Sequence, residues 1–308
     1  MAGKLKTMPT SPLNMILRHL LGDFKPEGNG MTDGELLARF VRSRDEDALA
    51  ALVRRHASMV WGVCHRLLNQ HDAEDAFQAT FLVLVRKAAD MPRQAVANWL
   101  YGVARQTAVR LRATAAKRGR REKQMVNIPE PVAAEVADAE LRRVMDEELS
   151  RLPDHYRSVV VLCDLEGMTR REAARQLGIP EGSVASRLAR ARALLGKRLT
   201  QRGVVFSGGS VAAVLAAGSA SASASAPPAL VASTIKAASL LAAGQAAGIV
   251  SAKVAALTEG VVQAMFVTKI KGVLVLALLV GLVLGGIGAG AGLWPNPAAV
   301  AQEPGGER

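Results

Sequence analysis

The chain has 308 residues, a formal net charge of +12 at pH 7 and a sequence pI near 10.3. That length allows two domains, and the basic balance suits a nucleic-acid or acidic-membrane partner. Of the 39 Lys and Arg residues, 34 precede residue 203, together with 24 of the 27 acidic residues. The charged and the apolar parts of the chain are therefore separate segments.

The residues that carry enzymatic chemistry are not arranged in any recognisable pattern. Cys64 and Cys163 lie far apart in apolar runs, so we expect buried thiols in a reducing compartment rather than a disulfide or a metal site. The five histidines form no cluster, and no glycine-flanked serine or phosphate-binding loop occurs. We therefore expect no enzyme, no cofactor and no metal.

Residues 1–30 form an N-terminal extension whose short apolar run is interrupted by Arg18 and His19, which argues against a secretory signal and for a cytoplasmic head. Residues 31–121 are helical in pattern throughout, with few glycines. The sequence therefore predicts an all-α protein that begins with one helical module.

Two helices of this module stand out. Residues 72–89 carry acids in the first turn and Arg86 and Lys87 in the last, and their apolar side chains share one face: Phe77, Phe81, Leu84 and Ala88. Residues 98–121 continue helically, and eight Lys or Arg lie between 105 and 123 against the single acid Glu122. Such a basic run suits contact with phosphates.

An acidic stretch with two prolines, residues 122–140, is predicted to be a linker. It leads to a second small helical module over residues 141–202, in which Pro153 and Asp154 open a helix that Gly167 closes.

The end of this module has the pattern of a helix-turn-helix. Thr169 and Glu172 form a capping box at the start of the first helix, and Gly178 and Pro180 end it in a turn over about 178–182. Ser183 is then placed to cap the second helix.

The second helix separates an apolar stripe from an outward face. The stripe is Val184, Leu188, Ala191 and Leu195, and Ser186, Arg187 and Arg190 point away from it as candidate base and phosphate readers. Residues 183–202 contain six Lys or Arg and no acid, which favours a polyanion partner. An ordinary helical hairpin with solvating arginines remains the alternative.

Beyond residue 202 the composition changes to Ala, Ser and Gly, and residues 203–271 are predicted to be a low-complexity spacer. The alternating Ser-Ala run Ser219–Ala229 is its most flexible part. Residues 230–268 fit either weakly amphipathic Ala-rich helices or a mobile tether, and the sequence does not decide between them.

Residues 272–293 contain 22 positions without a charge, enough to cross a bilayer as a helix. Lys269 and Lys271 precede this segment and Trp294 follows it, so we expect a single-pass membrane helix with its N-terminal side in the cytoplasm and residues 294–308 outside. A buried core helix is the alternative, which the many glycines disfavour.

Two motifs agree on one family. Asp72-Ala-Glu-Asp75 with Gln78 and Phe81, and Trp99-Leu100-Tyr101 with Val103-Ala104-Arg105, resemble motifs of the extracytoplasmic-function sigma factors of bacterial RNA polymerase. The resemblance covers about residues 35–202 and includes the helix-turn-helix. It implies a region 2-like bundle and a region 4-like helix-turn-helix domain, and core RNA polymerase and promoter DNA as partners.

The resemblance also implies a role for each surface. The residues implied to bind polymerase are Asp72, Glu74, Asp75, Gln78 and Phe81. Those implied to engage the −10 element are Asn98, Tyr101, Arg105, Gln106, Arg110 and Arg112, whereas Trp99 is taken as structural. Those implied to read the −35 element are Arg170, Arg171, Ser183, Ser186, Arg187 and Arg190.

Some positions depart from the family pattern. Gln106 and Arg110 replace the common Asn and Asp, and Ala185 stands where Lys is frequent, so the promoter preference does not follow from the resemblance. The membrane segment is absent from a minimal family member. It suggests either a tethered sigma factor or one that carries its own inhibitory segment. An alternative function is a membrane-anchored helix-turn-helix regulator that acts without polymerase. No anti-sigma protein or protease can be named from the sequence.

Overall fold

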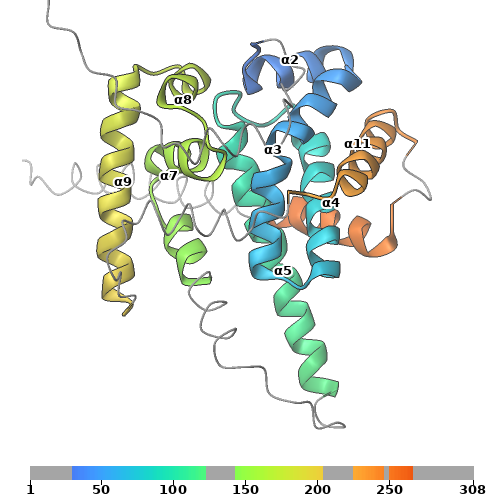
Figure 1. Cartoon of the computed structure of the whole chain (residues 1–308). Coiled ribbons are helices and arrows are strands. Elements are labelled where there is room, and N and C mark those ends of the chain that lie inside the picture. Colours follow the sequence, from blue (N-terminus) through green and yellow to red (C-terminus); the bar gives the residue numbers. More distant parts are fainter. Residues whose placement is uncertain (1–29, 123–142, 204–224, 246–249, 266–308) are drawn as a thin grey trace, which may run out of the picture. The chain divides into compact units, whose positions relative to one another are not determined.

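The computed structural model describes residues 30–122, 143–203, 225–245 and 250–265. Within these ranges the secondary structure is helical, with no strand, as expected for an all-α protein. The chain divides into two units, Met1–Val261 and Val262–Arg308, and the helices up to α11 belong to the first. Figure 1 shows them.

Four helices form the first bundle: α2 (Asp33–Ser43), α3 (Glu46–Leu67), α4 (Gln70–Lys87) and α5 (Val96–Glu122). Short polar side chains fix where three of them begin. Thr32 forms a reciprocal capping box with Glu35, Asp45 accepts from the backbone of Ala48, and Asn69 caps α4. The local sequence therefore sets the helix starts before any packing is considered.

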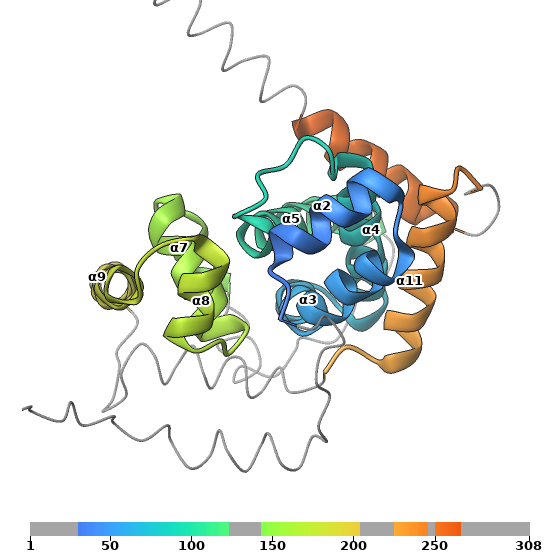
Figure 2. The same cartoon turned by 90° about the horizontal axis from the view of Figure 1, so that it is seen from above.

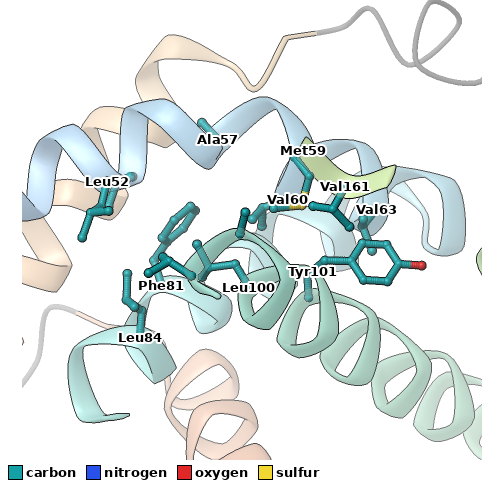
Figure 3. Packing of buried hydrophobic residues seen from close by; sticks show 14 of the residues in the cluster. Leu52, Ala57, Met59, Val60, Val63, Phe81, Leu84, Leu100, Tyr101 and Val161 are labelled. Carbon is teal, nitrogen blue, oxygen red and sulfur yellow. The ribbon is translucent and has the colours of Figure 1, made fainter. Parts of the chain in front are cut away.

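The core of this bundle lies where α3 packs against α2, α4 and α5. Trp61 meets Phe77 edge-on at 6.2 Å between ring centroids, and Phe77 meets Phe81 at 5.1 Å. Figure 3 shows Phe81 and Leu100 among the buried side chains. The predicted apolar face of α4 is confirmed, since Phe77, Phe81, Leu84 and Ala88 are all buried.

The second group of helices comprises residues 143–150, α7 (Asp154–Val160), the π-helix η1 (Val161–Leu165), α8 (Arg170–Leu177) and α9 (Glu181–Gln201). The predicted helical segment from Asp154 to Gly167 is present, but its last turn is a π-helix. The backbone N–H of Glu166 donates to the carbonyl of Val161 at 3.0 Å, which widens the turn. Gly167 then takes a positive φ of 69° and ends the segment.

The helix-turn-helix is confirmed in most details. Thr169 and Glu172 form the capping box, and Gly178 has the left-handed φ of 64° that lets the chain leave α8. The predicted cap at Ser183 was wrong: α9 begins at Glu181, and Pro180 stands before it without a side-chain cap. The restricted φ of Pro180, −59°, already suits the residue that leads into a helix.

The stripe on α9 is also confirmed, with Val184, Leu188, Ala191 and Leu195 all buried. The two groups of helices share one hydrophobic cluster. Val161 of η1 belongs to the same cluster as Val60 and Val63 of α3, as Figure 3 shows. Burying these side chains together removes apolar surface that neither group covers alone.

Residues beyond the helix-turn-helix add a further helix, α11 (Pro228–Ala242), and helical residues begin again at 252. The helical alternative for residues 230–268 is thus confirmed where the structure describes them. The end of the Ser-Ala run Ser219–Ala229, predicted to be flexible, belongs to α11, because Pro228 opens this helix at a position where proline is favoured. Figures 1 and 2 both show α11 alongside α4, against which it packs.

A search of the described residues finds no helix that is both long and apolar enough to cross a membrane. The predicted membrane segment 272–293 and most of the predicted linker 122–140 lie outside the described residues.

Candidate protein and nucleic-acid interfaces

The acidic residues of α4 lie together near its start. The backbone N–H of Asp72 donates to Asn69 Oδ1 at 2.9 Å, and Gln70 donates to Glu74 Oε1 at 2.7 Å. The side chain of Asp72 is 10% exposed and that of Asp75 is 21% exposed. Partial burial strengthens the pull of such carboxylates on a cation, because less water screens them.

The other predicted polymerase contacts on α4 divide into two kinds. Glu74 and Gln78 are half-buried and share the surface with Asp75. Phe81 is fully buried against Phe77, so the structure gives it a packing role in place of a surface contact.

The predicted −10 residues on α5 divide in the same way. Arg110 is exposed, and Arg105, Gln106 and Arg112 are half-buried. Asn98 and Tyr101 are instead buried under the second group of helices. Asn98 Oδ1 accepts from Arg157 Nε at 2.8 Å, and the Tyr101 hydroxyl donates to the carbonyl of Asp146 at 3.3 Å. These two side chains do not face DNA in the described arrangement.

The predicted −35 residues lie on α8 and on the first half of α9. Arg170, Arg171, Ser186 and Arg190 are exposed, and Ser183 and Arg187 are half-buried. Arg192 belongs to the same basic run but has a structural role, since its Nε donates to Asp164 Oδ2 at 3.2 Å and holds α9 on η1. The exposed Arg190 thus lies on a helix whose opposite side is held by this contact.

Sequence reasoning missed a buried charged cluster around His56. This side chain is fully buried, with Nδ1 2.5 Å from Glu166 Oε1 and Nε2 3.3 Å from Asp33 Oδ2. Arg55 also donates to Asp33 at 2.6 Å. His56 and Glu166 are 110 residues apart, so no local pattern signals their contact.

The charges of this cluster support one another. Burial alone would lower the pKa of His56, but the carboxylates of Glu166 and Asp33 outweigh it and raise that pKa to about 10. Burial works against ionised Asp33, yet His56 and Arg55 hold its pKa at about 2. Burial raises the pKa of Glu166 above its usual range. At neutral pH the imidazole of His56 is therefore protonated. It lies between Asp33 of α2 and Glu166, the residue that follows η1.

A second ionic contact joins the same two groups of helices. Arg66 donates to both oxygens of Asp146 at 3.1 Å, in the two-point geometry that arginine forms with carboxylates. In the part of the chain that the structure describes, no group of three or more His, Cys, Asp or Glu is placed to hold a metal ion.

The acidic face of α4 is the surface formed by Asp72, Glu74 and Asp75. A lysine from the C-terminal part of the chain contacts this face. Lys253 Nζ lies 2.7 Å from Asp72 Oδ1 and 2.6 Å from Asp75 Oδ2. These hydrogen bonds raise the pKa of Lys253. Nearby, Arg86 pairs with Glu259, and Arg110 donates to the carbonyl of Gly260.

Comparisons with known proteins agree with this geometry. Residues 52–118 match the family described as Sigma-70 region 2, and residues 142–195 match the one described as Sigma-70, region 4. The ECF RNA polymerase sigma factor SigM of Mycobacterium tuberculosis is 35% identical over 178 residues, which cover 54% of this chain and 85% of that protein.

Two further relatives carry the same description. SigW of Bacillus subtilis is 30% identical over 52% of this chain and 92% of its own length, and SigE of Mycolicibacterium smegmatis is 33% identical over 46% and 57%. The chain thus belongs to the ECF sigma factors of RNA polymerase. Members of this family are transcription initiation factors that work with core RNA polymerase and promoter DNA, and they are not enzymes.

The buried histidine predicts a pH dependence of stability. Folding raises the pKa of His56 to about 10, so the protonated ring stabilises the fold fully below the unfolded value of about 6.5, and this stabilisation is lost as the pH rises through about 10. From about pH 6 to about pH 8 the free energy of unfolding should fall by an amount of the order of 1 kcal/mol, measured by urea denaturation.

The His56→Gln variant should lose this dependence, because an amide does not titrate. The exposed His71 offers a matched control, and His71→Gln should keep the dependence of the unaltered chain. An unchanged pH profile in His56→Gln would contradict the assignment.

Proposed function

We propose that this sigma factor binds core RNA polymerase through the acidic face of α4, engages the −10 element with α5 and reads the −35 element with α9. The observation that carries the proposal is the combination of two surfaces: Asp72, Glu74 and Asp75 gathered on α4, and Ser186 and Arg190 exposed on a helix whose opposite side is buried.

The acidic face suits a basic partner surface. Asp75 accepts a lysine at 2.6 Å within the chain, so its carboxylate is oriented to receive a cation. A partner that supplies Lys or Arg to Asp72 and Asp75 would gain charge-assisted hydrogen bonds in a partly desolvated site.

The start of α9 suits the major groove of duplex DNA. In a helix-turn-helix the N-terminal residues of the second helix contact base edges, and arginine pairs with guanine through two hydrogen bonds. Arg187 and Arg190 are our strongest candidates, with Arg170 and Arg171 contacting phosphates. The buried stripe and the Arg192–Asp164 contact hold this helix at a fixed angle.

The −10 surface implies a rearrangement. Arg105, Gln106, Arg110 and Arg112 lie along α5, but Asn98 and Tyr101 are hydrogen-bonded to the second group of helices. We infer that these two contacts break when the promoter is engaged, so that unstacked bases can reach polar and aromatic groups.

Reversal of charge at Asp75 should abolish binding to polymerase. In Asp75→Arg a partly buried carboxylate is replaced by a cation that faces the cations of the partner. Loss of such a charge pair weakens the affinity about thirtyfold or more. The measurement is the dissociation constant for core RNA polymerase.

Asp90, exposed in the turn after α4, provides the control, and Asp90→Arg should bind as the unaltered chain does. Normal holoenzyme formation by Asp75→Arg would refute the assignment of this surface and would favour a regulator that acts without polymerase.

Loss of Arg190 should alter promoter choice rather than polymerase binding. Run-off transcription from a pool of random promoters should show a relaxed preference in the upstream element and an unchanged downstream element, since one base contact is worth about 1–3 kcal/mol of discrimination. Arg175→Ala, at an exposed position on α8, is the control. An unchanged upstream preference in Arg190→Ala would exclude Arg190 as a base reader.

We also propose that residues 272–293 tether the cytoplasmic DNA-binding part to the membrane. The proposal rests on their uninterrupted apolar sequence and on the flanking Lys269 and Lys271. Deletion of residues 266–308 should move the protein from the membrane fraction to the soluble fraction of cells. Retention in the membrane fraction would reject this segment as the anchor.

A further inference from the structure

The C-terminal part of the chain docks on the surface assigned above to polymerase. Lys253 lies between Asp72 and Asp75 and donates to both. The two carboxylates are 10% and 21% exposed, whereas the lysine keeps 39% of its side chain exposed. The contact thus joins a half-exposed lysine to two carboxylates that are largely shielded from water.

Apolar packing holds the same segment in place. Ala237 and Ala238 of α11 are buried where this helix packs on α3 and α4, and Val254 lies fully buried one residue from Lys253. Small side chains on α11 let its backbone approach α4 closely. Because Val254 is anchored, Lys253 is held over the acids rather than left free to move through solvent.

The contact extends beyond the acidic residues. Glu259 pairs with Arg86 at the far end of α4, and the carbonyl of Gly260 accepts from Arg110 on α5. Val261, fully buried, ends this stretch. One segment thus contacts both the acidic face of α4 and Arg110, one of the residues assigned to the −10 element.

From these contacts we propose that residues 228–245 and 250–261 are an intramolecular competitor of core RNA polymerase, with Lys253 occupying the place of a basic side chain of the polymerase. The proposal rests on the assignment of Asp72 and Asp75 to polymerase binding. The two occupants compete, because a second cation beside Asp72 and Asp75 would be repelled by the ammonium group of Lys253 and would share the oxygens that accept from it.

Competition of this kind lowers the apparent affinity for polymerase by the fraction of chains whose surface is uncovered. If one chain in ten is uncovered at a given moment, the apparent affinity is about tenfold weaker than that of the bare surface. Anything that draws residues 228–245 and 250–261 away then activates the sigma factor without altering the polymerase-binding residues themselves.

The test is the dissociation constant for core RNA polymerase of the full chain carrying Lys253→Glu. Placing a third carboxylate beside Asp72 and Asp75 repels the segment, so binding should tighten about three- to tenfold. Lys253→Gln, which removes the cation without adding repulsion, should tighten binding by a smaller factor. Lys253→Gln also tests the proposal if Lys253→Glu does not fold.

Lys236→Glu is the matched control, since Lys236 is exposed on α11 of the same segment and the charge change is identical. Its affinity should equal that of the unaltered chain. Equal affinities for Lys253→Glu, Lys253→Gln and Lys236→Glu would overturn the proposal, because the contact made by Lys253 would then have no effect of its own on polymerase binding.

Hydrogen exchange of the full chain gives a second readout. Backbone amides of α11 should lose protection when core RNA polymerase binds, and unchanged protection would overturn the proposal. The Asp75→Arg variant separates the two levels of inference. If it fails to bind polymerase while Lys253→Glu binds like the unaltered chain, the competitor is rejected and the proposed function stands; if Asp75→Arg binds normally, both are rejected.

Discussion

The interaction on which the arrangement of the two helical groups depends is the buried imidazolium of His56 between Asp33 and Glu166. A buried charge without partners is costly, so each member of such a cluster holds the others in place, and removal of one leaves an uncompensated charge in the interior. Because Asp33 lies in the first group of helices and Glu166 in the second, the cluster stabilises one relative placement of α2, α3 and η1. The shared hydrophobic cluster adds stability to that placement, but charge pairing makes it specific.

The same principle links this interior to the functional surfaces. Asn98 is satisfied by Arg157, and Asp72 and Asp75 are satisfied by Lys253, so several groups assigned to external partners already have internal ones. Under the proposed function, binding polymerase or promoter DNA exchanges one set of partners for another instead of filling bare sites. An exchange has a small net free energy even when each contact is strong, which makes it easy to regulate.

Features that depend on a few neighbouring residues were predictable. The capping box of Thr169 and Glu172, the left-handed Gly178 and the stripe from Val184 to Leu195 follow from spacings of three or four residues, and the structure confirms them. The errors were also local. The wide turn of η1 depends on which of two backbone hydrogen bonds forms. The start of α9 at Glu181 depends on which of two residues stands at the N-cap. The neighbouring sequence alone decides neither choice.

The sequence by itself determined the helical class, the two family motifs and the exposed Arg190 of α9, because periodicity, capping and residue type act over one or two turns of helix. Only the tertiary structure decided that Asn98 and Tyr101 are buried, that His56 is charged in the interior and that Lys253 contacts the acids of α4. Those outcomes join residues separated by 45 to 181 positions. Contacts at such separations are chosen by the packing of whole helices, and no local pattern encodes them.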